Sequence, residues 1–180
     1  GVWIWFLGAL AGFVCHTNQS KLADYYRNIH LFFLKGKEGS ELDSFEKLRK
    51  EFYTLSWKQN GVWTLFLYFY GNYTRSQEQM TPRFQAFRKA WEAQFPDGNL
   101  PQRLRDDFRK GSLPLMPFAN ILTFNTRAIA LYVSLLIGLP YLYFLFEIFL
   151  LTALFVYMKY KHESLCERLT TQLPTYESTL

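Results

Sequence analysis

The sequence predicts an all-α protein in which multi-span transmembrane helices carry a helical cytoplasmic insertion. Charge is distributed very unevenly. Residues 128–158 contain no Lys, Arg or Asp, whereas the whole net charge of +5 arises within residues 16–117. A soluble domain would mix apolar and charged residues along its length. Strand patterns are nearly absent, and Pro and Gly residues separate segments of helical periodicity in the charged part. The mean hydropathy of −0.09 therefore averages a membrane region and an aqueous one.

The clearest transmembrane segment is residues 140–158. Its 19 residues come close to the ~20 that a helix needs to cross a hydrocarbon core about 30 Å thick. Pro140 suits the first helical turn, where its missing N–H costs nothing. Lys159, Lys161 and His162 follow the apolar run, and positive charge at this end favours a cytoplasmic exit.

A second span precedes it, over residues 119–138, and begins with polar residues. Gly138 and Pro140 break the helical pattern, so residues 118–159 are expected to form an antiparallel transmembrane hairpin. The tip of this hairpin carries no charge, which is consistent with translocation across the membrane. Both of its ends, and with them a tail over residues 160–180, are then expected in the cytoplasm.

The amino-terminal apolar run, residues 2–15, starts immediately after Gly1 and lacks the basic region of a signal peptide. We interpret residues 1–15 as the end of a transmembrane helix that starts upstream; a processed amino terminus is the alternative. The topology requires this helix to run inward. Apolar residues continue at helical spacing beyond Cys15, so the helix is expected to reach about residue 35.

Residues 36–117 are predicted to be a cytoplasmic helical region that is partly interfacial. Thr81 and Pro82 form a typical N-cap and first-turn pair. Residues 61–70 are apolar but only about half as long as a span. They are expected in the interface or in a core, because a crossing here would reverse the topology. The glycosylation sequon at Asn72 is discounted on the same ground.

No catalytic motif is present in the sequence, and no catalytic or metal-binding residue is predicted. Asp106 and Asp107 are adjacent, and adjacent residues on a helix point about 100° apart, so a solvated face explains them better than an ion site. Cys15 and Cys166 show no framework spacing and are expected to be free thiols.

Four cations are candidates for binding phosphate or lipid headgroups: Lys21, Arg27, Lys35 and Arg127. Lys21 and Arg27 lie where the first helix should leave the membrane. Asp24 lies one helical turn before Arg27, so a simple pair that orients the helix is the competing interpretation.

Arg127 lies near the start of a span, where an ionisable group is costly unless it faces a cavity or a headgroup; snorkelling to lipid phosphate is the competing interpretation. Glu147 lies in the middle of the last span. It should be neutral or packed against another helix, which can include one outside the present sequence.

Basic residues alternate with aromatic ones around Arg83 and Trp91, a pattern that could suggest nucleic acid. Beside membrane spans, attraction to the anionic cytoplasmic leaflet explains the same pattern with fewer assumptions, so lipid is the expected partner and nucleic acid is not.

Several segments together resemble the carboxy-terminal half of CDP-alcohol phosphatidyltransferase-like membrane proteins. They are ADYYRN at residues 23–28, IHLFFLKGKEGSELD at 29–43, LRDDFRKGSLPLM at 104–116, NILTFNTRAIALYVSLLIG at 120–138, and the final span. The family signature DGxxARx(8)GxxxDxxxD does not occur here, since Asp97-Gly98 continues into Asn99-Leu100.

The resemblance implies the distal portion of an enzyme of phospholipid biosynthesis that moves a phosphate-linked group from a CDP-activated donor to an alcohol and releases CMP. It implies Mg²⁺ or Mn²⁺ in the full-length protein, with ligands upstream of Gly1. A bacterial inner membrane and a homodimer are further expectations. Two other function classes stay open: a non-enzymatic, lipid-binding membrane scaffold, and a segment of a transporter in which Arg127 and Glu147 would line a pathway.

Overall fold

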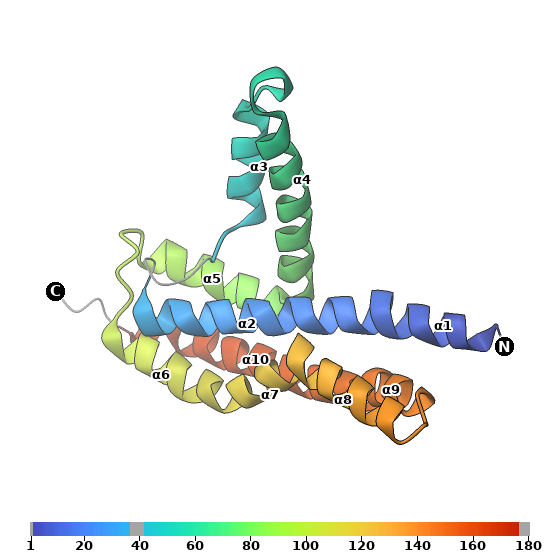
Figure 1. Ribbon diagram of the computed structural model, residues 1–180. Helices are drawn as coiled ribbons and strands as arrows, with labels where there is room; N and C mark the ends of the chain where they lie inside the picture. Colours follow the sequence, from blue (N-terminus) through green and yellow to red (C-terminus); the bar gives the residue numbers. More distant parts are fainter. Residues whose placement is uncertain (1, 37–41, 177–180) are drawn as a thin grey trace.

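The computed structural model describes residues 2–36 and 42–176, apart from the side chains of residues 57–59. Throughout this described part the chain is helical, without strands, which confirms the predicted all-α class. The longest elements run nearly side by side along one axis, and a helical arm projects across that axis (Figure 1).

The amino-terminal helix runs without interruption through α1 (Trp3–Ala9), the π-helical segment η1 (Leu10–His16) and α2 (Thr17–Lys35). It ends at Gly36, whose positive φ of 81° favours glycine. Along α2, Leu22, Tyr26, Ile29 and Phe33 are fully or almost fully buried and recur every three to four residues. The helix therefore continues past Cys15 to Lys35, as the sequence predicts.

The arm consists of α3 (Phe45–Thr54) and α4 (Trp57–Met80), which pack against each other. Ser44 caps α3 by accepting a hydrogen bond from the Lys47 amide at 3.3 Å. Residues 61–70 belong to α4, and most of their large apolar side chains are exposed. Of the two expected positions for these residues, the exposed side chains disfavour a core and are compatible with an interface.

The chain then returns through α5 (Pro82–Gln94), α6 (Gln102–Ser112), η3 (Leu113–Leu115), α7 (Met116–Ile121) and α8 (Phe124–Leu136). Helix α5 starts at Pro82 as predicted, but the Thr81 side chain does not cap it. The Thr81 hydroxyl donates backwards to the Gln77 carbonyl at 2.9 Å, and the amide of Arg83 in the first turn donates to the Glu163 carboxylate at 2.8 Å instead. A carboxylate at this position also complements the helix dipole.

A sharp turn at Gly138, with φ of 72°, leads into the last helix, as the sequence predicts. This helix comprises α9 (Tyr141–Leu145), the π-helical segment η4 (Phe146–Leu151) and α10 (Thr152–Gln172), and the short helix η5 (Leu173–Thr175) follows. Residues 160–176, predicted as a cytoplasmic tail, continue the last helix and η5 and pack into the core. Apolar residues such as Leu165 and Leu169 bury the second half of α10 against α5 and α6; residues 177–180 lie outside the described part.

The core lies in the charged half of the chain, where α2, α5, α6 and α10 meet. Aromatic rings fill it: Phe33 stacks on Phe108 with centroids 3.8 Å apart, and Phe87 packs edge-on against Trp91 at 4.7 Å. This half is a normal buried core built from the helices that the sequence predicts to be cytoplasmic.

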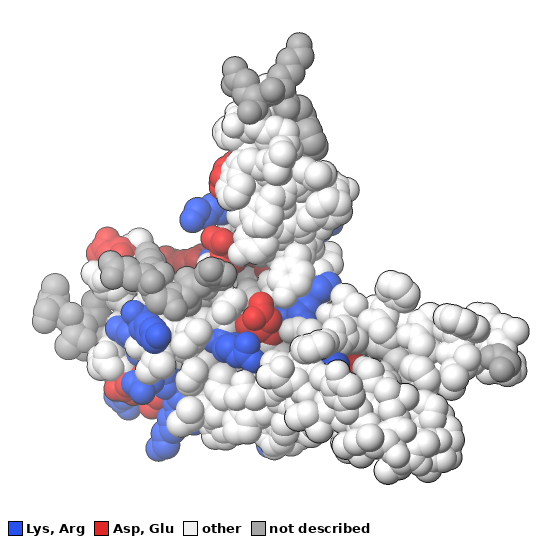
Figure 2. All heavy atoms as spheres, in the orientation of Figure 1, with Lys and Arg blue, Asp and Glu red and all other residues white. Residues whose placement is uncertain are grey.

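The other half is apolar on its outside. Figure 2 shows the end formed by α1, α8 and α9 almost free of charged side chains on the visible face. Leu136, Phe13, Trp3 and Phe149 are among the most exposed large apolar residues. Among the described residues, two helices are long and apolar enough to cross a membrane, Gln102–Leu136 and Tyr141–Thr175, and only 22% and 17% of their apolar stretches are buried. The amino-terminal helix is not among them, so two of the three predicted spans meet this criterion.

Gly111 on α6 is a position where the close approach of α10 requires glycine. A Cβ placed there would meet the buried Leu165 side chain, with Cδ2 2.9 Å away and Cδ1 closer still. We expect Gly111→Ala to lower stability by about 1–2 kcal/mol, because overpacking outweighs the gain in helix propensity. Gly71→Ala in α4 is the matched control, since its Cβ would make only ordinary contact with Phe45 at 3.9 Å.

Thermal unfolding of the purified protein, followed by its tryptophan fluorescence, measures both variants. Gly71→Ala should raise the unfolding temperature and Gly111→Ala should lower it. A rise in both would show that α6 and α10 are not packed this closely.

Candidate functional site

A buried ion pair joins the two helices of the carboxy-terminal hairpin, α8 and the last helix. The Nε of Arg127 on α8 lies 3.1 and 3.0 Å from the two carboxylate oxygens of Glu147 on η4. Both side chains are almost completely buried, at 3% and 0% exposure. Glu147 thus has a partner within the chain, on the neighbouring helix, rather than on a helix outside it.

Gln19 brings the amino-terminal helix into the same cluster. Its side-chain oxygen accepts a hydrogen bond from Arg127 Nη2 at 2.5 Å, and its amide nitrogen donates to the Thr152 hydroxyl at 3.0 Å and to the Glu147 carbonyl at 3.4 Å. The Leu122 and Thr123 carbonyls accept from Arg127 Nη1. Three helices are therefore joined by one polar network inside an apolar surrounding.

The two π-helical segments pack against each other directly beside this network. η1 ends at His16, three residues before Gln19, and η4 contains Glu147. A π-helical turn rotates the side chains that follow it relative to a regular α-helix and is frequent at functional positions. Here we attribute to it the register that brings Gln19 and Glu147 to the same depth.

The network is chemically closed. The carboxylate compensates the guanidinium charge, and Nε, Nη1 and Nη2 of Arg127 each donate a hydrogen bond to an oxygen atom of the chain. Arg127 was predicted as a phosphate or headgroup ligand, but in this arrangement it is turned toward Glu147. A buried charge that is paired and hydrogen-bonded serves to specify packing.

The other three candidate cations lie apart. Lys21 donates to the Ser76 hydroxyl of the arm at 2.9 Å, Arg27 donates to the Asn120 side-chain oxygen on α7 at 3.2 Å, and Lys35 is exposed at the far end of α2. The structure does not bring the four cations to one site. The predicted Asp24–Arg27 pair does not form either, because the Asp24 carboxylate accepts a hydrogen bond from the Tyr73 hydroxyl at 3.4 Å.

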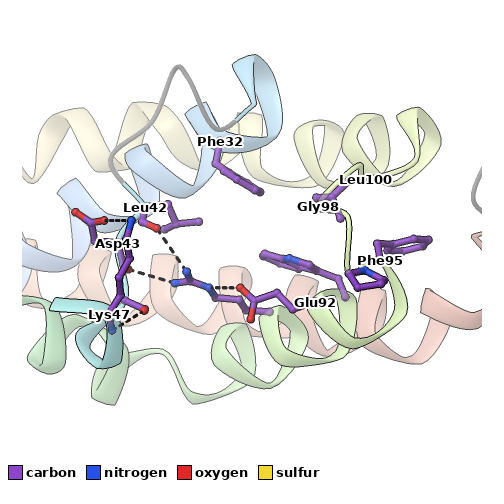
Figure 3. Close-up of a pocket in the computed structure, with 12 residues that line it drawn as sticks. Phe32, Leu42, Asp43, Lys47, Glu92, Phe95, Gly98 and Leu100 are labelled. Atoms are coloured by element: carbon purple, nitrogen blue, oxygen red, sulfur yellow. Dashed lines mark hydrogen bonds and ion pairs between the residues drawn. The ribbon is translucent and has the colours of Figure 1, made fainter. Parts of the chain in front are cut away.

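A small cleft of about 390 Å³ opens in the charged half, between the end of α2, the start of α3 and α5 (Figure 3). Phe32 and Phe95 line its apolar wall. Arg88 crosses it and is held by Glu92 at 3.0 Å and by the Asp43 carbonyl at 3.2 Å. Its central cation is therefore already occupied by groups of the chain.

A second buried polar cluster was not anticipated from the sequence. His162, Glu163 and Cys166 on α10 place one ligand atom each within 4.8 Å of one another, and all three are buried. Among the described residues this is the group of His, Cys and acidic side chains that could hold a metal ion. The spacing His-Glu-x-x-Cys is a sequence signal that could have found it, because residues four apart share one face of a helix.

Burial controls the protonation of this cluster, which lies beyond the apolar stretch of the last helix. Burial lowers the pKa of His162 to about 3 and raises the pKa of the Cys166 thiol well above its ordinary value. Burial also raises the pKa of Glu163, although hydrogen bonds from the Arg83 and Phe84 amides oppose this. With no ion bound, His162 and Cys166 are therefore both uncharged near neutral pH.

Asp106 and Asp107 do not form an ion site. Asp106 accepts hydrogen bonds from the Gln102 and Arg109 side chains on the surface of α6, whereas Asp107 accepts a hydrogen bond from the Tyr176 hydroxyl at 2.7 Å.

No protein family, curated protein or solved structure matches the chain.

Removing one partner of the Arg127–Glu147 pair should destabilise the protein strongly. Arg127→Met leaves the Glu147 carboxylate buried and unpaired, and we expect a loss of about 3–5 kcal/mol in the free energy of unfolding. The double variant with Glu147→Leu removes both charges and should recover most of that loss.

Loss of helical circular dichroism during titration of the micellar protein with SDS measures these variants. Lys50→Ala is the control, because it breaks the exposed Lys50–Glu46 pair and should leave the midpoint unchanged. A double variant as unstable as the single one would show that the pair is not an isolated, mutually compensating unit.

Proposed function

We propose that this chain is the distal, membrane-embedded portion of a phosphotransferase that moves a phosphate-linked group from a CDP-activated donor to an alcohol. In this proposal the chain closes and anchors the helical bundle, and the metal-binding aspartates lie upstream of Gly1, as the resemblance implies. Mg²⁺ or Mn²⁺ would neutralise the diphosphate and stabilise the leaving CMP.

The observation that carries the proposal is how the resembling segments assemble. They lie on α2, on α6 with η3, on α7 with α8, and on the last helix, separated by as many as 60 residues in sequence. Helix α2 contacts α6 and α7, and α10 contacts α2, α6 and α7. These segments therefore lie in one packed body, which is what the proposal requires.

The exposed apolar end supports the membrane placement in this proposal. If α1 with η1, α8 and the helix from Tyr141 to about Met158 lie in lipid, their large exposed side chains face hydrocarbon, and the core of α2, α5, α6 and α10 lies at the cytoplasmic surface. The Arg127–Glu147 pair is then inside the membrane but turned toward the bundle, where an ion pair is tolerated.

The arm would lie along the membrane surface. Its base is attached to α2 by the Lys21–Ser76 hydrogen bond, two residues beyond Gln19 and hence near the membrane boundary. Figure 1 shows the arm crossing the bundle axis, with α4 on the side nearer the apolar end. On α4, Val62, Leu65, Phe66 and Phe69 are exposed at the spacing of one helical face.

Among the cation candidates, Arg27 is best placed for a headgroup phosphate. It lies eight residues beyond Gln19 on α2, about 12 Å along the helix axis. It is only partly buried, and Asn120 orients it at the point where α7 approaches α8. Lys21 is engaged with the arm, and Lys35 is about 12 Å farther out.

The enzymatic part of the proposal is tested in membranes from cells that express the complete reading frame. The transfer is reversible in principle, so labelled CMP should enter a CDP-linked lipid in the presence of Mg²⁺ or Mn²⁺ without any need to know the alcohol. We expect this exchange with the complete protein and its loss with EDTA. Complete protein present in the membrane without exchange above the empty-vector membranes would contradict the phosphotransferase and favour the lipid-binding scaffold, for which the exposed face of α4 is the specific observation.

Placement of the arm is tested by spin labels in lipid nanodiscs, in a background from which Cys15 and Cys166 are removed. A label at Phe66 should be relaxed by oxygen, which partitions into lipid, and a label at Glu46 on α3 by a water-soluble nickel complex. A label at Leu136 reports on the span. Nickel access at Phe66 with protection at Leu136 would remove the arm from the membrane surface, whereas nickel access at both would contradict the membrane embedding itself.

A further inference from the structure

The polar cluster on α10 contains atoms that have no partner in the protein. Nε2 of His162 and Oε1 of Glu163 are buried and make no hydrogen bond, and the buried hydroxyl of Tyr26 is unpaired in the same way. The Tyr26 ring stacks on the His162 ring with centroids 3.7 Å apart. Buried polar atoms without a partner are rare in proteins, so those of this cluster call for a missing ligand or water.

The residue types and their spacing are those of a metal site. His162 and Cys166 lie one turn apart on the same face of α10, and their Nδ1 and Sγ atoms are 3.7 Å apart. In zinc-binding helices of the His-Glu-x-x-His type, two ligands stand at this same spacing, and the glutamate after the first is a general base rather than a ligand. Here cysteine replaces the second histidine. Adjacent residues on a helix point about 100° apart, but the Glu163 oxygen lies within 4.8 Å of both the His162 and the Cys166 ligand atoms. Thiolate sulfur, imidazole nitrogen and carboxylate oxygen are all zinc ligands.

The surroundings fix the carboxylate for such a role. The Arg83 amide at the start of α5 donates to Oε2 of Glu163 at 2.8 Å, which leaves Oε1 directed away from this bond and unpaired. Groups that hold one oxygen of a ligand in this way orient it and are typical of metal sites. The Arg83 guanidinium makes its ion pair with Glu167, at 2.7 Å on the surface.

Charge balance is compatible with a divalent cation. Zn²⁺ binding displaces the proton of the Cys166 thiol into solvent, and a thiolate, a carboxylate and a neutral imidazole around Zn²⁺ carry no net charge. A buried site with zero net charge avoids the cost of an isolated ion. A water molecule could also satisfy the unpaired atoms, but it does not account for a thiol, a carboxyl and an imidazole whose ligand atoms lie within 4.8 Å of one another.

We infer that His162, Glu163 and Cys166 bind one zinc ion on α10, where the Arg83 amide of α5 and the Tyr26 ring of α2 contact two of its ligands. A fourth ligand, which a water molecule can supply, completes the tetrahedral ion. The ion has a structural role, because the cluster is enclosed by Phe84 and Phe108, whose ring centroids lie 6.0 and 5.9 Å from that of His162. This inference depends on neither the membrane placement nor the proposed phosphotransferase.

The test uses the Cys15→Ser variant of the whole chain, in which Cys166 is the sole remaining thiol. Zinc is measured by mass spectrometry after purification without chelators; the ion is then removed and replaced by Co²⁺. We expect about one ion per chain and a near-ultraviolet thiolate-to-cobalt charge-transfer band, which added zinc abolishes.

Because this measurement leaves the cluster intact, it does not depend on a destabilising substitution. The Cys15→Ser/Cys166→Ala variant should lose the charge-transfer band, and Lys50→Ala should keep it. Zinc below about a tenth of an ion per chain together with no charge-transfer band would overturn the inference and assign the unpaired atoms to buried water. Cobalt bound without the band would overturn it as well, because Cys166 would not be a ligand.

Discussion

Arg127 and Glu147 can be buried among apolar helices only because each compensates the charge of the other. This constraint determines much of the apolar half: α8 and η4 must face each other at one depth, and Gln19 must present its amide to both. Most of the surrounding side chains are apolar. A hydrogen-bonded ion pair is directional, so it selects a single register among helices that apolar contacts alone would leave free to slide.

The charged half is organised around a second polar cluster on the same last helix. His162 lies 15 residues beyond Glu147, about 22 Å along the last helix. There α2 and α5 pack against α10. The amino-terminal helix and the last helix therefore both contribute to the two clusters. The base of the arm contacts α2 between these clusters, through the Lys21–Ser76 hydrogen bond. Such an arrangement connects a bundle suited to lipid with a core suited to water, and neither half requires the other's kind of packing.

Much of this fold could be predicted from residue patterns. The helix to Lys35, the turn at Gly138 and the start of α5 follow from Gly, Pro and apolar spacing. The Arg127–Glu147 pair was also within reach, because these residues lie almost equally far from the hairpin turn on opposite arms. Gln19, Tyr26 and Arg83 were not, because their partners are brought together only by tertiary packing. The same packing buries residues 160–176. The charged side chains of this segment predict a solvated end of the chain, so its His-Glu-x-x-Cys spacing did not indicate a buried site.

Hydrogen–deuterium exchange of the chain in lipid nanodiscs tests most directly whether the ion pair holds the apolar half together. In the parent protein, amides of α1, η1, α8 and η4 should exchange slowly. Glu147→Gln should accelerate exchange in all of these segments and leave α5 and the second half of α10 protected. Acceleration confined to η4, or spread evenly over the whole chain, would contradict the view that this pair joins three helices into one unit.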